Sequence, residues 1–294
     1  MTSDGPTPHV IVIGAMKAGT TTLYDYMAAH PQIGVSCEKE TDFFIAEKNW
    51  KRGLDWYRSL FPPGSKITVE ASPNYTKRAA FSGVPERIHA TLPDCRFIYI
   101  TRNPVARAES QYRHAVAAGA PVPPVENLLG SHTFDHLVDT SSYGAQITPW
   151  LELFPRDRFL FLDFDELVSA PSTLQSRLAA FLGVDDNWPT PTKTAANKGD
   201  GLSRLPLWVF RWREARLVST IKRYLPRSVV ERAKSVVSGK PKRVPPRFAE
   251  EIKQAIHDAT NEDLLAFERI RPPATTAPAA HELQIHSPSQ SAHG

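Results

Sequence analysis

The sequence predicts an α/β fold in which helices pack on both faces of a central, mainly parallel sheet. At the N-terminus, the apolar run Val10–Ile13 meets Gly14 and is followed by a helical pattern over Thr20–His30. A strand, a glycine turn and a helix in this order begin a doubly wound sheet. Strand-like and helix-like segments then alternate over most of the chain. Its 294 residues, 41% of them hydrophobic, are enough for a large core.

The further elements carry their own start and stop signals. Pro31 follows the first predicted helix, Pro62 follows the second, and Pro104 occupies the first position of the fourth, where its missing N–H costs nothing. Strands are expected over residues 10–13, 66–70, 96–101 and 159–163. The expected helices repeat apolar residues every three or four positions and cover 20–30, 50–61, 85–92, 104–118, 143–154, 172–182 and 247–270.

One domain is expected over residues 9–271, after a flexible polar N-terminus at 1–8. Residues 272–294 are polar and contain proline, which predicts a disordered tail. Residues 204–243 hold many Lys and Arg against only Glu214 and Glu231. This basic segment is interpreted either as a solvated helical insertion or as a segment that contacts a glycan, an anionic headgroup or a membrane surface.

Charge and cysteine content narrow the class of protein. A formal charge of +4 is too small for a general nucleic-acid binder but suits a protein that handles anionic small molecules. The two cysteines, Cys37 and Cys95, have neither metal-site spacing nor a partner framework, so no metal site is expected. The apolar run at Val10 is too short for a signal peptide or a membrane span, so a soluble, cytoplasmic protein is expected.

The first glycine turn, GAMKAGTTT, resembles a phosphate-binding loop with one change. Gly14 and Gly19 have the separation found in the P-loop motif GxxxxGK[ST], but Thr20 replaces the lysine that reaches a third phosphate. Lys17 lies on the loop instead, where it can neutralise a leaving oxygen on a shorter phosphate chain. The threonines at the helix start, Thr20–Thr22, offer hydroxyls and N–H groups to an anion. The fold class is therefore a P-loop-type three-layer sandwich in which ATP or GTP hydrolysis is disfavoured.

A second anion site is predicted beyond the strand 96–101. Arg102 follows that strand at its carboxyl end, where sheets of this kind bind ligands, and Ser110 lies two turns into the next helix. An arginine there can hold a phosphate through two hydrogen bonds, and a serine can complete the shell. A surface salt bridge is the alternative for Arg102 alone. Together with the first loop, this second anion site indicates a nucleotide that carries phosphates at two positions.

In these segments the chain resembles the sulfotransferases that use 3′-phosphoadenosine 5′-phosphosulfate (PAPS), especially the heparan-sulfate branch and its bacterial relatives. The matching segments follow the family's order over about the first two-thirds of the chain. They are KAGTTTLYDYMAAHPQI (17–33), KETDFF (39–44), GLDWYRSLF (53–61), VEASPNY (69–75), VPERI (84–88), TRNPVARAESQYRH (101–114), YGAQITPWLELFP (143–155) and NKGDG (197–201).

The resemblance implies a role for each matching residue. The 5′-phosphosulfate would lie on the loop formed by Lys17, Ala18, Gly19, Thr20, Thr21 and Thr22. Arg102 and Ser110 would hold the 3′-phosphate, while Lys198 and Gly201 would belong to a late loop that covers the nucleotide. No metal is required, because PAPS carries an activated sulfuryl group and Lys17 supplies the positive charge.

The same resemblance implies which residues would act on the acceptor. Sulfuryl transfer needs a base on the incoming hydroxyl, and Glu40 corresponds to the family's acidic residue before a Phe pair. Desolvation by Phe43 and Phe44 is expected to raise its basicity, whereas an ion pair with Lys39 or Arg52 is the alternative role. His114 is a candidate to assist proton transfer. Glu70 and Tyr75 are candidates for acceptor contact, although Ala71 stands where several family members have a lysine.

The expected reaction is sulfuryl transfer by in-line displacement to a hydroxyl of a carbohydrate or glycoconjugate. A small natural-product or lipid hydroxyl is the alternative acceptor, and the sequence leaves the oligomeric state open. A P-loop kinase or NTPase is a competing interpretation, since FLFLD (159–163) is similar to a Mg²⁺-binding strand. A non-catalytic nucleotide-binding protein is the third, and Glu40 together with Lys17 argues against it.

Overall fold

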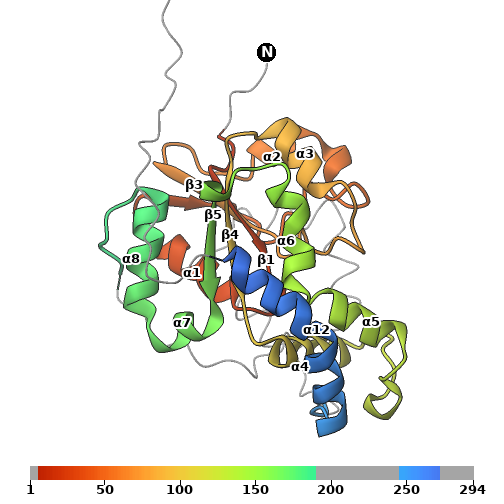
Figure 1. Ribbon diagram of the computed structural model, residues 1–294. Helices are drawn as coiled ribbons and strands as arrows, with labels where there is room; N and C mark the ends of the chain where they lie inside the picture. The colour runs from red at the N-terminus through yellow and green to blue at the C-terminus, as the bar shows by residue number, and fades with distance from the viewer. Residues whose placement is uncertain (1–5, 190–244, 272–294) are drawn as a thin grey trace, which may run out of the picture.

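The computed structural model describes residues 6–189 and 245–271 and contains a five-stranded sheet in the order β2-β3-β1-β4-β5 (Figure 1). Every pairing is parallel, which confirms the predicted parallel sheet. The strands are β1 Val10–Gly14, β2 Ile33–Val35, β3 Ile67–Ala71, β4 Arg96–Thr101 and β5 Phe159–Asp163.

Helices cover both faces of this sheet. Figure 1 shows α1 and α8 on one side of the strands and α3, α6 and α12 on the other. The α-helices are α1 Thr20–Ala29, α2 Leu54–Arg58, α3 Val84–Thr91, α4 Pro104–Ala117, α5 His132–Asp139, α6 Tyr143–Leu151, α7 Phe164–Ser169, α8 Pro171–Leu182 and α12 Glu250–Ile270. Short 3-10 turns lie at Trp50–Arg52, Val125–Asn127 and Arg156–Arg158.

The core follows from the continuous apolar runs of the strands. All residues of β1 and β3 are buried, as expected for parallel strands covered on both faces. Aromatic rings from β4, β5 and α6 pack together on one face, with the Phe97 ring centroid 5.2 Å from that of Trp150. Burial of their side chains on both faces of the sheet is therefore what stabilises the central strands.

Among the strands and α-helices of the described residues, β2, α5 and α7 were not predicted, and one helix was predicted wrongly. β2 is only three residues long, and α5 and α7 are short and polar on one side. The single helix expected over 50–61 is wrong, because the chain forms a 3-10 turn and then α2. Gly53 separates them with φ +81°, a backbone conformation that no helix contains.

A second, smaller core joins α4, α5 and α12. Its buried residues include Tyr112, Leu137 and Ile256. Asp263 of α12 fixes this layer to α6, because its carboxylate accepts hydrogen bonds from the N–H groups of Gly144 (2.9 Å) and Ala145 (2.7 Å). The three helices project together beyond the end of the sheet in Figure 1.

Several predictions concern residues outside the described ranges. Lys198 and Gly201, the basic segment 204–243, the tail 272–294 and most of the N-terminal segment 1–8 lie there. Among the described residues, no helix has the length and apolar character needed to cross a membrane.

Candidate functional site

The site lies where two neighbouring strands lead the chain in different directions. β1 is at the centre of the sheet, with β3 on one side and β4 on the other. The glycine loop leaves the carboxyl end of β1, and Arg102 follows the carboxyl end of β4. Ligands of open α/β sheets bind at this kind of switch point.

The glycine loop turns sharply into α1. Lys17 and Gly19 both have positive φ, +66° and +94°, and Gly19 is the residue immediately before the helix. A Cβ atom on Gly19 would lie 2.8 Å from Leu167 Cδ2 and 2.9 Å from Phe164 Cδ2, so only glycine fits against α7. The tight turn thus depends on glycine for both conformation and space.

The start of α1 presents donors to an anion. The N–H of Leu23 is the first to bond within the helix, to the carbonyl of Gly19 at 3.0 Å, so the preceding turn has N–H groups without a helical acceptor. Thr20 is buried, Thr21 exposed and Thr22 half-buried. Ala18 was predicted to be part of the anion-binding loop. Its N–H instead donates to the carbonyl of Ala15 at 3.2 Å and is not free for a ligand.

Arg102 is held beside this loop from several directions. Its Nη1 atom lies 3.5 Å from the carbonyl oxygen of Lys17, and its guanidinium lies 4.3 Å from the centre of the Phe164 ring. Tyr143 fixes its backbone by donating to the Arg102 carbonyl at 2.6 Å. The structure thus brings the two predicted anion-binding segments together. Ser110 lies half-buried on α4, the helix that follows Arg102.

Lys17 lies among other charges. Burial lowers the pKa of Lys17, Glu40 counteracts this, and Lys39 and Arg102 lower it further. A site in which cations repel one another while helix N–H groups point outward is prepared for a negatively charged ligand. A bound phosphate would raise the pKa of Lys17 again.

Glu40 is presented by a strained loop, with φ +60° at Glu40 and φ +46° at Asp42. Both residues are fixed to the chain after β3: the Glu40 N–H donates to the Ala71 carbonyl at 2.9 Å, and the Asp42 N–H donates to Ser72 Oγ at 3.1 Å. Non-glycine residues hold such conformations only where their surroundings enforce them, which is common at functional sites.

The charges of several lysines act on the Glu40 carboxylate. Lys39 Nζ is 2.6 Å from Glu40 Oε1, while 44% of the Glu40 side chain remains exposed. Burial raises the pKa of Glu40, but Lys39, Lys77 and Lys48 together lower it below its ordinary value. The expectation that desolvation by Phe43 and Phe44 would raise its basicity is therefore wrong, because nearby cations dominate. The predicted alternative contact with Lys39 is present.

His114 completes the group. Burial lowers the pKa of His114; Lys17 and Lys77 lower it further, and Glu40 acts in the opposite direction. The imidazole on α4 therefore lies within the electrostatic reach of both the phosphate loop and the Glu40 loop. The structure brings Lys17, Glu40, Arg102 and His114 into one site, and their roles stay predictions.

The prediction that Glu70 and Tyr75 contact the acceptor is contradicted by their burial. Glu70 has 0% and Tyr75 1% of its surface exposed. Glu70 Oε1 accepts hydrogen bonds from Ser72 (2.6 Å), Tyr75 (2.8 Å) and Thr41, and Oε2 accepts one from Tyr57. These hydroxyls leave no side of the carboxylate open to a substrate.

This buried cluster holds the loop that carries Glu40 in place through hydrogen bonds to its backbone. Thr41 Oγ1 accepts a hydrogen bond from the N–H of Phe43 at 3.3 Å, and the Tyr75 hydroxyl accepts one from the N–H of Phe44 at 3.3 Å. Burial raises the pKa of Glu70, whereas the four hydroxyl donors favour its charged form. Glu70 and Tyr75 are positioning residues in this structure.

Sequence reasoning missed the cations and amide around Asp42. Lys48 Nζ lies 2.5 Å from Asp42 Oδ2, and Asn74 Nδ2 lies 3.0 Å from the same oxygen. Lys77 follows in the turn after Asn74, and burial, aided by Lys48, lowers its pKa to about 8. Charged residues clustered in KETDFF and NYTK were the available signal, but only the fold shows that they converge.

The competing kinase interpretation relied on Asp163 at the end of β5. Its carboxylate instead accepts a hydrogen bond from the N–H of Asp165 at 2.8 Å, which caps α7, and contacts Arg271 Nη1 at 3.2 Å. Within residues 6–189 and 245–271, no group of three or more His, Cys, Asp or Glu side chains is arranged to hold a metal ion. Cys37 is exposed and Cys95 is buried, and no disulfide joins them.

Fold and site together define a nucleotide-type α/β protein whose phosphate loop lacks the triphosphate lysine and faces a glutamate–histidine site. The comparisons give the family. Residues 7–197 match the Sulfotransferase domain model, and the chain belongs to that family.

Relatives and a solved structure agree with this assignment. The chain is 35% identical over 188 residues to human heparan sulfate glucosamine 3-O-sulfotransferase 6, covering 60% of this chain and 52% of that protein. It is 28% identical over 193 residues to bifunctional heparan sulfate N-deacetylase/N-sulfotransferase 1 of Caenorhabditis elegans, covering 61% of this chain and 22% of that protein. The match thus spans about half or less of these relatives. A sulfotransferase from Alicyclobacillus acidocaldarius has a similar structure, with a TM-score of 0.58, 26% identity and coverage of 66% of this chain and 88% of that one.

Proposed function

We propose that this protein transfers a sulfuryl group from PAPS to a carbohydrate hydroxyl. The observation that carries this proposal is the convergence of Lys17 and the α1 N-terminus, Arg102, and the Glu40–His114 pair at one switch point of the sheet. Membership in the sulfotransferase family supports the reaction class. Both named relatives are sulfotransferases of heparan sulfate, which supports a sugar acceptor.

The donor side fits a nucleotide with two separate phosphate groups. The N–H groups of the first α1 turn and Lys17 would hold the 5′ end, while Arg102 and Ser110 would hold the 3′-phosphate. When bound, PAPS supplies a sulfuryl group that is already activated by its bond to phosphate. Lys17 would stabilise the negative charge that develops on the departing phosphate oxygen.

The acceptor side needs a proton acceptor at the hydroxyl. Glu40 is ionised at neutral pH, since the surrounding lysines hold its pKa below the ordinary value, and its exposed carboxylate oxygen would accept the hydroxyl proton. His114 lies within the same charges and would orient the hydroxyl. The low basicity of Glu40 implies that proton transfer accompanies, rather than precedes, sulfuryl transfer.

Nucleotide selectivity is the first test. Isothermal titration calorimetry with adenosine 3′,5′-bisphosphate, adenosine 5′-phosphate and ATP–Mg²⁺ should show the strongest binding for the bisphosphate. Arg102→Met should remove this preference while leaving adenosine 5′-phosphate binding nearly unchanged, and Arg247→Met serves as a surface control. A stronger response to ATP–Mg²⁺ would favour the kinase interpretation instead.

Transfer itself is tested with labelled PAPS and a panel of glycosides, a lipid alcohol and a phenol. Sulfation of the glycosides supports the proposal; sulfation of only the lipid alcohol or the phenol would replace carbohydrate with the alternative acceptor class. The cytoplasmic location expected from the sequence stays a prediction.

A further inference from the structure

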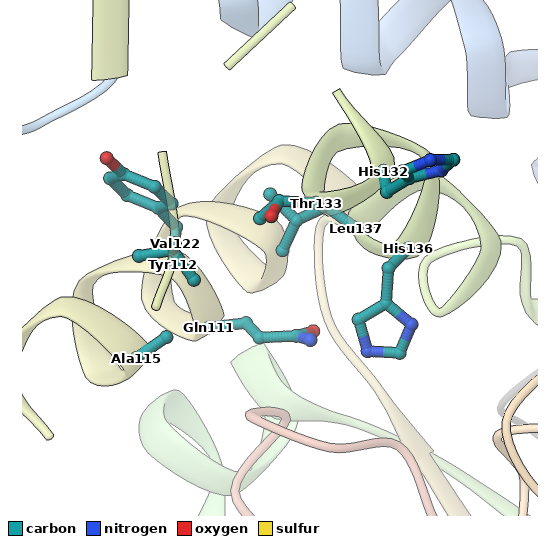
Figure 2. A pocket seen from close by; sticks show the side chains of 8 residues that line it. All are labelled: Gln111, Tyr112, Ala115, Val122, His132, Thr133, His136 and Leu137. Atoms are coloured by element: carbon teal, nitrogen blue, oxygen red, sulfur yellow. The ribbon is translucent and has the colours of Figure 1, made fainter. Parts of the chain in front are cut away.

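A pocket of about 340 Å³ lies between α4 and α5. Figure 2 shows its lining side chains, which come from α4, from the loop after it and from α5. They are Gln111, Tyr112, Ala115, Val122, His132, Thr133, His136 and Leu137. The volume is at the lower end of the ~300–1,000 Å³ typical of small-molecule sites, which suits one or two rings.

Gln111 presents a fixed hydrogen-bond donor to this pocket. Its Oε1 accepts hydrogen bonds from Arg107 Nη1 at 2.5 Å and from the Thr140 hydroxyl at 3.1 Å. A guanidinium can only donate, so the amide oxygen must face Arg107 and the NH₂ group must face the other way. Only 8% of Gln111 is exposed, and the residue lines the pocket. A donor directed into the pocket favours a ligand that brings an oxygen.

The helix layer holds this amide in place. Arg107 is 0% exposed and also donates to Ser141 Oγ at 2.8 Å and to the Leu137 carbonyl at 2.9 Å. Every anchor of Gln111 is therefore buried between α4 and α5. The donor cannot turn away without breaking bonds of a buried charge.

The pocket lies next to the candidate site along helix α4. Gln111 and His114 are three residues apart on α4, so their side chains are neighbours on the helix surface at ~5–6 Å between Cβ atoms. The charge of Lys77 acts on His114 and also on His136 in the pocket. A ring attached to a sugar that is bound at His114 would therefore lie within reach of the pocket.

The lining is apolar on one side and polar on the other. Tyr112 contributes its ring, because its hydroxyl is bonded to the Pro123 carbonyl at 2.8 Å, and Val122 and Leu137 continue the apolar wall. The Gln111 amide and the side chains of Thr133 and His136 supply hydrogen-bonding groups. A pyranose ring has the matching pair of surfaces, with axial C–H groups on one face and hydroxyls at the edge.

We propose that this α4–α5 pocket is an acceptor subsite that binds a sugar ring next to the one that is sulfated, with Gln111 Nε2 donating to a ring hydroxyl or ether oxygen. This inference rests on the proposed function. A purely apolar chain would leave the Gln111 donor buried and unpaired, so the pocket selects sugar over lipid.

Two variants test the subsite without disturbing the donor site. Gln111→Glu keeps oxygens for Arg107 and Thr140 but replaces the NH₂ donor with an acceptor, and Thr133→Phe fills the pocket. With labelled PAPS and a glucosamine-containing disaccharide, both should raise the acceptor KM roughly tenfold with little change in kcat. The KM for the methyl glycoside of glucosamine, which has no second ring, should be unchanged. Thr173→Phe, on the exposed face of α8, is the control for the added ring.

Binding gives a readout without turnover. In the presence of adenosine 3′,5′-bisphosphate, the disaccharide should shift the imidazole NMR signals of His132 and His136 in the wild type and in Thr173→Phe, but not in Thr133→Phe. Unchanged disaccharide KM values in both pocket variants, or unshifted imidazole signals while bisphosphate binds, would overturn the subsite and leave the donor site intact. If the bisphosphate itself fails to bind, the proposed function fails instead.

Discussion

The main-chain N–H of Glu40 donates a hydrogen bond to the carbonyl oxygen of Ala71 across 2.9 Å. Ala71 is the last residue of β3, so this bond fixes the candidate base to the edge of the sheet at which the nucleotide loop also begins. Ala71 itself is fully buried and contributes no charge. Lys77, six residues after Ala71, is one of the lysines that lower the pKa of Glu40.

Glu40→Gln should abolish most transfer while leaving the donor site functional. Removing the proton acceptor is expected to lower kcat by ~10²–10⁴, whereas the affinity for adenosine 3′,5′-bisphosphate should stay within about twofold, because the backbone of the loop is unchanged. Turnover with labelled PAPS and calorimetry measure the two quantities. Glu47→Gln, at an exposed neighbouring position, is the control. Near wild-type turnover in Glu40→Gln would remove Glu40 from the catalytic role.

Lys39→Met should move the acid limb of the pH profile to higher pH. Glu40 acts in its ionised form, so kcat/KM falls as the pH drops through its pKa. Lys39 is the cation that lowers this pKa most, so its loss makes Glu40 protonate at higher pH. A series of kcat/KM values from pH 4 to 8 measures the shift. Lys51→Met, an exposed change on the neighbouring 3-10 turn, should leave the profile in place, and an equal shift there would argue against a local effect.

Tyr57→Phe should cost stability and transfer rate together. The Tyr57 hydroxyl is the partner of Glu70 Oε2, and its loss leaves a buried carboxylate oxygen without that donor. The expected decrease in the free energy of unfolding is about 1–3 kcal/mol, measured by urea denaturation. Because the cluster supports the Glu40 loop, kcat should also fall severalfold without a change in bisphosphate affinity.

Tyr26→Phe is the matched control, since Tyr26 is half-buried on α1 and makes no hydroxyl hydrogen bond to another described residue. A stability loss in Tyr57→Phe with unchanged kcat would show that the cluster is structural only. Equal effects in both variants would contradict the role of Glu70.

Gly19→Ala should damage the nucleotide loop. The substitution places a Cβ within 2.9 Å of both Leu167 and Phe164 and strains a residue at φ +94°. Displacement of the loop should weaken bisphosphate binding by about tenfold or more. Gly64→Ala has a similar φ of +78° but no atom within 4 Å, so it imposes the strain without the collision. Calorimetry on the two variants separates these effects, and equal affinities would contradict the packing argument.

The parallel sheet and the meeting of the glycine loop with Arg102 were predictable because their signals are local. Val10–Ile13 and Phe97–Ile100 are uninterrupted apolar runs, as expected of strands that are covered on both faces. The glycine spacing around Lys17 and the position of Arg102 after a strand then place both at one sheet edge. Each step uses neighbours in the sequence.

The acceptor side was harder to predict because it depends on distant contacts. Glu70 looks like a ligand-contacting residue in VEASPNY, but hydroxyls from Thr41 and Tyr57, far away in the sequence, enclose it. Likewise, the low pKa of Glu40 arises from lysines on three separate segments. The pocket needs α5, whose eight residues gave too weak a helical pattern to be predicted.

Helix α4 carries residues from each part of the proposed reaction. Ser110, Gln111 and His114 lie within little more than one turn of it, and their proposed partners are the donor, the acceptor ring and the reacting hydroxyl. A helix repeats every 5.4 Å and resists stretching, unlike a loop. The separation between nucleotide and sugar is therefore set by helical pitch. A single-residue insertion between Ser110 and His114 would rotate the groups on one side of it by about 100° relative to those on the other. The donor and the acceptor would then no longer be aligned for transfer.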